Sequence, residues 1–96
     1  MQKLTTTLPL RAEGEHLQHL PGSFGVERDD WYVEARRGDG EVVLSVTARR
    51  PRQALEHLAA SDDPLDRWFK DQLRELTGED VTTAFAVALA RRARQH

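Results

Sequence analysis

The sequence predicts an α+β fold in which one four-stranded antiparallel sheet carries its helices on one face, in the order βαββαβ. Two observations lead to this prediction. Apolar and polar residues alternate on both sides of a turn within residues 31–48, as expected of a β-hairpin. Apolar residues recur at every third or fourth position over residues 64–77, as expected of a helix packed on a sheet. The 96 residues are enough for one domain, 1–96.

The first part of the chain predicts a strand and a short helix. Leucine and threonine alternate over residues 3–8, which indicates a strand that Pro9 ends. Leucines at helical spacing within 10–20 indicate a short helix that Pro21-Gly22 closes. The stretch 22–25 contains two glycines without the spacing of a phosphate-binding loop, so we interpret it as a plain connection.

The hairpin is the clearest pair of strands in the sequence. Residues 31–36 and 42–48 each place apolar side chains on alternate positions. Between them, Asp39-Gly40 supplies the backbone conformation that a tight hairpin turn requires. Trp31 and Tyr32, being neighbours in a strand, are expected to point to opposite faces of the sheet.

Two helices are expected to follow the hairpin. Pro51 suits a first helical turn, and an apolar stripe follows it on a short helix. Asp63 is a suitable N-cap for a second helix over 64–77, and Gly78 is a suitable left-handed C-cap.

Local periodicity leaves residues 81–89 open between helix and strand. A helical stripe and a strand face fit equally well: the helical stripe comprises Val81, Ala84, Phe85, Ala88 and Leu89, and the strand face comprises Val81, Thr83, Phe85, Val87 and Leu89. A βαββαβ sheet needs a last strand, so we predict a strand here. Residues 91–96 are then a basic tail that frays at the end of the domain.

Composition excludes several classes of protein. The chain has no cysteine, which excludes disulfide scaffolds, thiolate zinc sites and thiol catalysis, and fits a cytoplasmic location. Its net charge of -2 and a basic cluster limited to Arg91, Arg92 and Arg94, without a broader basic face, argue against a nucleic-acid partner. No apolar segment is long enough for a signal peptide or a membrane span, so no membrane partner is expected.

The order of the expected elements is that of ferredoxin-like domains. The stretch 58–69, preceded by Trp31-Tyr32-Val33, resembles small actinobacterial proteins of the dimeric α/β-barrel superfamily, which includes antibiotic-biosynthesis-monooxygenase-like domains, polyketide cyclases and sugar mutarotases. The resemblance covers 24–78. It implies a homodimer paired through the sheet faces and a cleft between sheet and helices. The short segment 11–28 departs from the pattern, because it shortens the first helix.

Six residues are candidates for lining such a pocket: Trp31, Tyr32, Trp68, Phe69, His16 and His19. One of the first two faces the helices, where its polar atom would need a partner and could orient a ligand. Trp68 and Phe69 lie on the apolar stripe of the second helix, so each is expected to pack in the core or to form the wall of a pocket. The two histidines are three residues apart, but no third ligand is near, so no metal is expected.

Helix capping and the helix dipole explain Asp63 and Asp66, and the sequence contains no nucleophile elbow and no dinucleotide-binding fingerprint. No cofactor is therefore expected. We favour a small-molecule-binding or accessory protein, which could act in secondary metabolism on a small apolar ligand. A cofactor-free cyclase, isomerase or monooxygenase stays open, because positioning and exclusion of water need few catalytic groups. A structural or interaction protein without a cleft also stays open.

Overall fold

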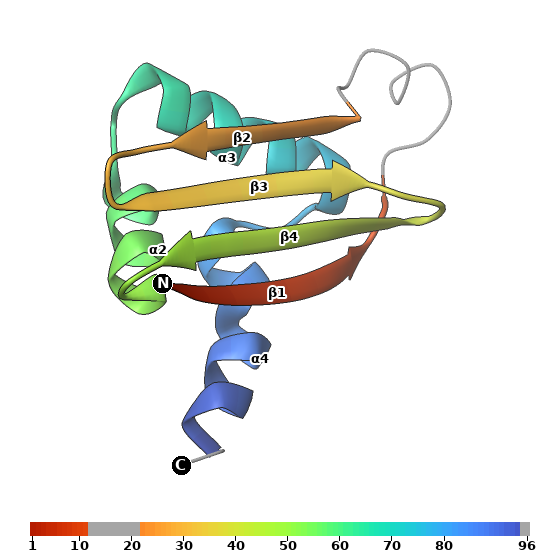
Figure 1. Ribbon diagram of the computed structural model, residues 1–96. Helices are drawn as coiled ribbons and strands as arrows, with labels where there is room; N and C mark the ends of the chain where they lie inside the picture. The colour runs from red at the N-terminus through yellow and green to blue at the C-terminus, as the bar shows by residue number, and fades with distance from the viewer. Residues whose placement is uncertain (12–21, 95–96) are drawn as a thin grey trace.

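Four antiparallel strands form one sheet, and three helices cover one of its faces in this computed structural model (Figure 1). The structure describes residues 1–11 and 22–94. The strands are β1 (Gln2–Pro9), β2 (Ser23–Glu27), β3 (Trp31–Arg37) and β4 (Glu41–Ala48). The helices are α2 (Pro51–Ala60), α3 (Pro64–Thr77) and α4 (Val81–Arg94). Across the sheet the order is β1-β4-β3-β2, so β1 and β2 are the two edges.

The first strand and the hairpin are confirmed. Strands β3 and β4 pair so that Val33 lies opposite Val46, and both side chains face the helices. Gly40 has a φ of 70°, the left-handed conformation that the tight turn was expected to need. Strand β1 pairs with the free side of β4.

The caps of α3 are also confirmed. The Asp63 carboxylate accepts a hydrogen bond from the Leu65 backbone N–H at 3.0 Å, and Gly78 ends the helix with a φ of 75°. The buried side of α3 is narrower than the apolar stripe in its sequence. Phe69 is fully buried, whereas Leu65 and Trp68 are 44% and 41% exposed.

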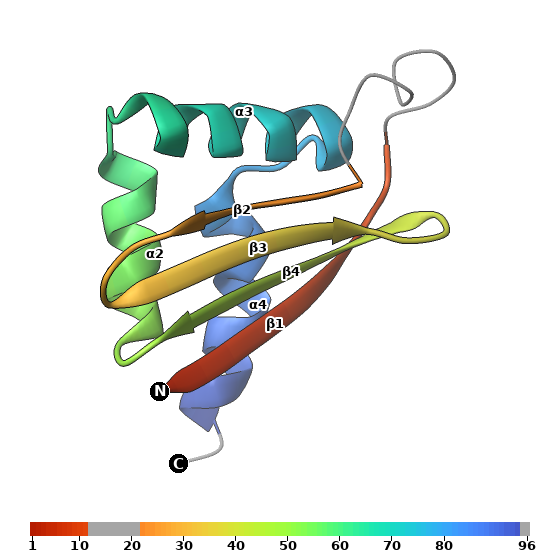
Figure 2. The same ribbon diagram turned by 45° about the horizontal axis from the view of Figure 1, so that its top comes forward.

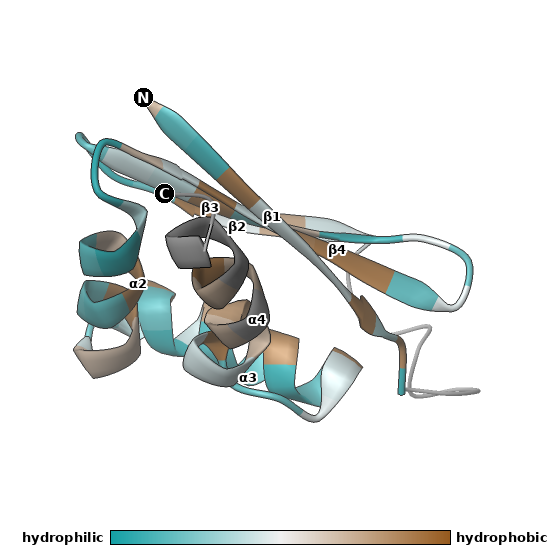
Figure 3. Cartoon of the chain, turned by 90° about the horizontal axis from the view of Figure 1, so that it is seen from below, coloured by the Kyte–Doolittle hydropathy of each residue, from teal (hydrophilic) through white to brown (hydrophobic). Residues whose placement is uncertain are grey.

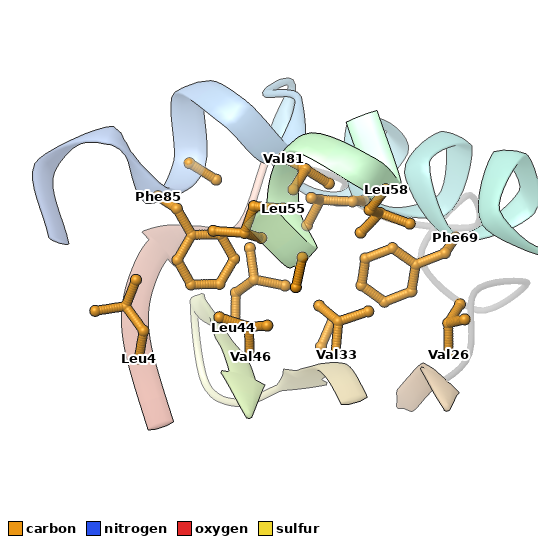
Figure 4. Close-up of a cluster of buried hydrophobic side chains, with 14 of the residues drawn as sticks. Leu4, Val26, Val33, Leu44, Val46, Leu55, Leu58, Phe69, Val81 and Phe85 are labelled. Carbon is orange, nitrogen blue, oxygen red and sulfur yellow. The ribbon is translucent and has the colours of Figure 1, made fainter. Parts of the chain in front are cut away.

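The strand predicted over residues 81–89 is wrong, because this segment belongs to helix α4. Asp80 begins the helix: its carboxylate accepts the Thr83 backbone N–H at 2.8 Å, and its carbonyl accepts the Ala84 N–H at 2.9 Å. Figure 4 shows Phe85 pointing from α4 toward the sheet, as Phe69 does from α3. Residues 91–94 of the predicted tail continue the helix.

The plain connection predicted at 22–25 is also wrong, because strand β2 already begins at Ser23. Phe24 and Val26 are buried and alternate with more exposed neighbours, so the segment follows a strand period that its glycines obscured. The predicted helix within 10–20 falls mostly outside the described residues. Within the described part, four strands precede three helices, so the βαββαβ order is not the one found.

The helices cover only one face of the sheet, as Figure 3 shows from below. That face carries the apolar core, which includes Val33, Leu44 and Val46. The opposite face, called the open face below, carries polar residues on the two strands that pair at the β1 edge: Thr5, Thr7, Ser45 and Thr47. No helix in the described part of the chain is long and apolar enough to cross a membrane.

We expect the cap at Asp80 to stabilise α4 in a pH-dependent way. The hydrogen bond from the Thr83 N–H lowers the pKa of Asp80 below its usual 3.8. A carboxyl with a depressed pKa contributes stability above its unfolded-state pKa and loses it as the pH falls through the folded-state value. Asp80→Ala should therefore lower the free energy of unfolding by about 1 kcal/mol at neutral pH.

Urea unfolding of both proteins near neutral pH and below about pH 3 measures this difference. The gap between wild type and Asp80→Ala should shrink in acid. Asp62→Ala is the matched control, because Asp62 is an exposed carboxylate outside the helices. An Asp80 effect that is the same at both pH values would contradict the assignment of the cap to the ionised carboxylate.

Candidate functional site

A groove of about 1120 Å³ opens at one end of the sheet. One wall is the turn from β2 to β3, and the other is the connection from β4 into α2. The two walls meet because Trp31, the first residue of β3, pairs with Ala48, the last residue of β4. Strand register therefore brings together two segments that lie far apart in the sequence.

The floor of the groove is aromatic. Trp31 is only 6% exposed, and its ring lies edge-on to the His57 ring of α2, with 6.1 Å between the centroids. On the same indole, the Arg28 guanidinium carbon lies 6.0 Å from the ring centroid. Ala48 and Ala54 also line the groove, and their small side chains leave room beside the indole. Because the two rings already contact each other edge-to-face, a flat ligand ring would lie beside this aromatic pair and not between its members.

The walls carry opposite charges. Asp29 and Asp30 lie on the β2–β3 wall, and Arg49 and Arg50 lie on the β4–α2 wall. All four are exposed, and no ion pair or hydrogen bond within residues 1–11 and 22–94 engages their side chains. These charges are thus available to a ligand, unlike that of Arg28.

Arg28 is committed to the fold. Its guanidinium Nη2 donates to the Asp66 carboxylate at 2.7 Å and lies 3.3 Å from that of Asp63. Asp66 is 1% exposed, so this contact supplies the countercharge that a buried carboxylate needs. The pair joins the end of β2 to the first turn of α3 and fixes the rim of the groove.

A second hollow of about 360 Å³ lies between the α2–α3 connection and the start of α4. Its amine, Lys70, donates to the backbone carbonyls of Ala59 and Ser61 at 3.1 and 2.9 Å. These carbonyls stand at the C-terminus of α2, where a cation suits the helix dipole. The Lys70 amine in this hollow therefore caps the C-terminus of α2, which is a structural role.

The structure describes four of the six candidate residues, and it does not bring these four together in one site. Only Trp31 lines the groove. Tyr32 lies on the open face, where its hydroxyl donates to Glu34 at 2.5 Å, and this bond raises the pKa of Tyr32 above its usual value. Phe69 is in the core, and Trp68 packs edge-on against Phe24 with centroids 5.6 Å apart. The remaining pair, His16 and His19, lies outside the described residues.

Sequence reasoning missed the partners of Trp31. The sequence places His57 on the polar side of its helix, and the structure shows it exposed there. Arg49 and Arg50 stand between two elements with no recognisable motif. The two arginines have one feature in the sequence that could indicate a site, which is their position directly after a strand and before a helix. Within the described part of the chain no group of three or more histidine, aspartate or glutamate side chains could hold a metal ion.

No protein-family model, curated protein or solved structure matches this chain. The relationship to the dimeric α/β-barrel superfamily therefore stays a prediction. The function has to be inferred from the geometry of the groove.

Proposed function

We propose that this chain is a small-molecule-binding protein and that its ligand occupies the groove beside Trp31. One observation carries the proposal: an aromatic floor lies between a wall of carboxylates, which includes Asp29 and Asp30, and a wall with the guanidiniums of Arg49 and Arg50. Ligand sites combine an apolar surface with a few polar groups that fix orientation, and this groove has both.

The charges of the walls favour an amphoteric ligand. A planar ring would rest near Trp31 and His57, an anionic group would face Arg49 and Arg50, and a cationic group would face the aspartates. The sequence led us to expect an apolar ligand. The apolar floor fits that expectation only in part, and the walls add a charged group at each end.

A catalytic role has less support from the same geometry. His57 is the groove's imidazole, and no side-chain hydrogen bond in the described part of the chain orients it. General bases are usually held by a second group. A cyclase, isomerase or monooxygenase activity thus stays a hypothesis without a supporting contact. The presence of the groove disfavours the third alternative, an interaction protein without a cleft.

The predicted homodimer through the open face also stays a hypothesis. Its residues are mostly polar or charged, and Tyr32 and Val43 are the less polar exceptions. Burial of such a face would remove little apolar area from water, so the hydrophobic contribution to this contact would be small.

Three molecules with the same indole ring test the charge preference of the groove: tryptophan, tryptamine and indole-3-propionate. We expect tryptophan to shift the NMR signal of the Trp31 indole N–H at millimolar concentration, which is the affinity range of a fragment. The variant Trp68→Phe assigns that signal, because the chain has two tryptophans.

The double variant Arg49→Gln/Arg50→Gln should weaken tryptophan and indole-3-propionate by about threefold to tenfold, with little effect on tryptamine. Arg52→Gln is the matched control, since Arg52 is an exposed arginine of α2 that does not line the groove. Shifts that avoid Trp31, or an equal loss for all three molecules, would refute the proposed site.

A further inference from the structure

Strand β2 is an edge strand whose outer side pairs with no other strand among residues 1–11 and 22–94. The Gly22 carbonyl accepts the Arg37 N–H, and the Arg28 N–H donates to the Trp31 carbonyl, each at 2.8 Å. Antiparallel strands alternate in direction, so even-numbered residues of β2 bond to β3. The N–H and C=O groups of Ser23, Gly25 and Glu27 therefore point away from the sheet.

The two edges of the sheet differ in how they are protected. Strand β1 carries Lys3 and ends at Pro9, which are residues that discourage pairing at an edge. Strand β2 has neither lysine nor proline, and glycine stands at its centre. In the order β1-β4-β3-β2 no strand pairs with its outer side in the described part of the chain.

Exposed apolar side chains gather around β2. Apart from Met1, the large ones in the described part of the chain are Tyr32, Leu65 and Trp68, at 36%, 44% and 41% exposure. Tyr32 covers the centre of β2 on the open face, since a Cβ built on Gly25 would lie 3.2 Å from its hydroxyl oxygen.

The other two lie on α3, which runs beside β2 as Figure 2 shows. Trp68 contacts Phe24 of β2, and Leu65 lies one helical turn before it. The unpaired edge is thus bordered by apolar groups on both faces, which is typical of a surface that binds another protein.

We propose that β2 pairs with β2 of a second copy of this chain, antiparallel and across a two-fold axis at Gly25. The register would oppose Ser23 to Glu27 of the second copy and Gly25 to Gly25. These are the residues whose backbone groups point outward, so three pairs would contribute about six hydrogen bonds. The contact would join two four-stranded sheets into one, and Leu65 and Trp68 of both copies would be brought toward the axis.

Charge complementarity identifies a second copy as the occupant. Arg36 lies beside Ser23 in the β2–β3 register. In the proposed pairing, Ser23 lies between Arg36 and Glu27 of the second copy, on the open face. The Cα atoms of these two charged residues would be two strand spacings apart, about 9.5 Å. Serine is short, so the Glu27 carboxylate of the second copy could reach above it to the exposed Arg36 guanidinium, which already lies 3.2 Å from the Glu34 carboxylate. The two-fold axis makes this contact occur twice.

The test is a mixing experiment with two charge variants. Glu27→Arg places two arginines together in the proposed dimer, and Arg36→Glu places two glutamates together, so each variant alone should be at least about tenfold weaker in self-association than wild type. In an equimolar mixture both pairs become opposite charges again, and native mass spectrometry should detect the mixed dimer above either homodimer.

Both substitutions are at exposed positions, so the fold is retained, which circular dichroism verifies. Trp68→Ala should weaken the dimer as well, while Thr5→Arg on the open face should leave it unchanged. A wild-type chain that stays monomeric at about 100 μM, a mixture that forms no mixed dimer, or a dimer dispersed by Thr5→Arg overturns the proposal.

Discussion

Replacing Phe85 with alanine is expected to lower the free energy of unfolding by about 3 to 5 kcal/mol. The Phe85 side chain is fully buried and points from α4 onto the end of the sheet near Leu4 (Figure 4). Alanine would lose the transfer free energy of the ring and leave a cavity that the sheet and α2 cannot close. Urea unfolding followed by circular dichroism measures the loss.

Lysine substitutions at two neighbouring positions test whether residues 81–89 form a helix or a strand, which the periodicity of the sequence allows equally. In α4, Thr83 is exposed and Ala84 is buried. Thr83→Lys should change stability by less than about 0.5 kcal/mol, whereas Ala84→Lys buries a charge and should cost several times more. In a strand, Thr83 would share the buried face with Phe85, so the opposite ranking would contradict α4.

The two errors in the sequence-based fold have one origin. Gly22 and Gly25 made residues 22–25 look like a connection, which left the sheet one strand short. The ambiguous residues 81–89 were then assigned to the missing strand, although alanine content favoured a helix. The hairpin and α3 were predictable, because turn and cap residues agreed there with periodicity.

The groove was less predictable than the fold. Trp31 was a candidate because it and Tyr32 are neighbouring aromatic residues in a clear strand, so one of the two was expected to face the helices. Its neighbours come from a different turn and from α2, and the pairing of Trp31 with Ala48 brings them together. Local periodicity carries no information about such long-range pairing, so His57 and the two arginines could not be assigned to a site from the sequence.

The contact between Arg28 and Asp66 is expected to have the second large effect. Arg28→Met would leave the 1% exposed Asp66 carboxylate without its 2.7 Å partner. Breaking a buried ion pair by removing one member costs about 3 to 5 kcal/mol, because the remaining charge stays desolvated. Arg28 is itself 30% exposed, so water can partly replace it, and we expect about 3 kcal/mol. Urea unfolding measures the loss.

The double variant Arg28→Met/Asp66→Leu distinguishes the desolvation cost from the strength of the pair. Apolar residues of similar size leave no buried charge, so most of the lost stability should return. A double variant as unstable as Arg28→Met would instead mean that the ion pair itself holds β2 against α3. In that case the groove and the β2 edge would lose their shape together. Strand β2 borders both of them, and Arg28 at its end holds it to the first turn of α3.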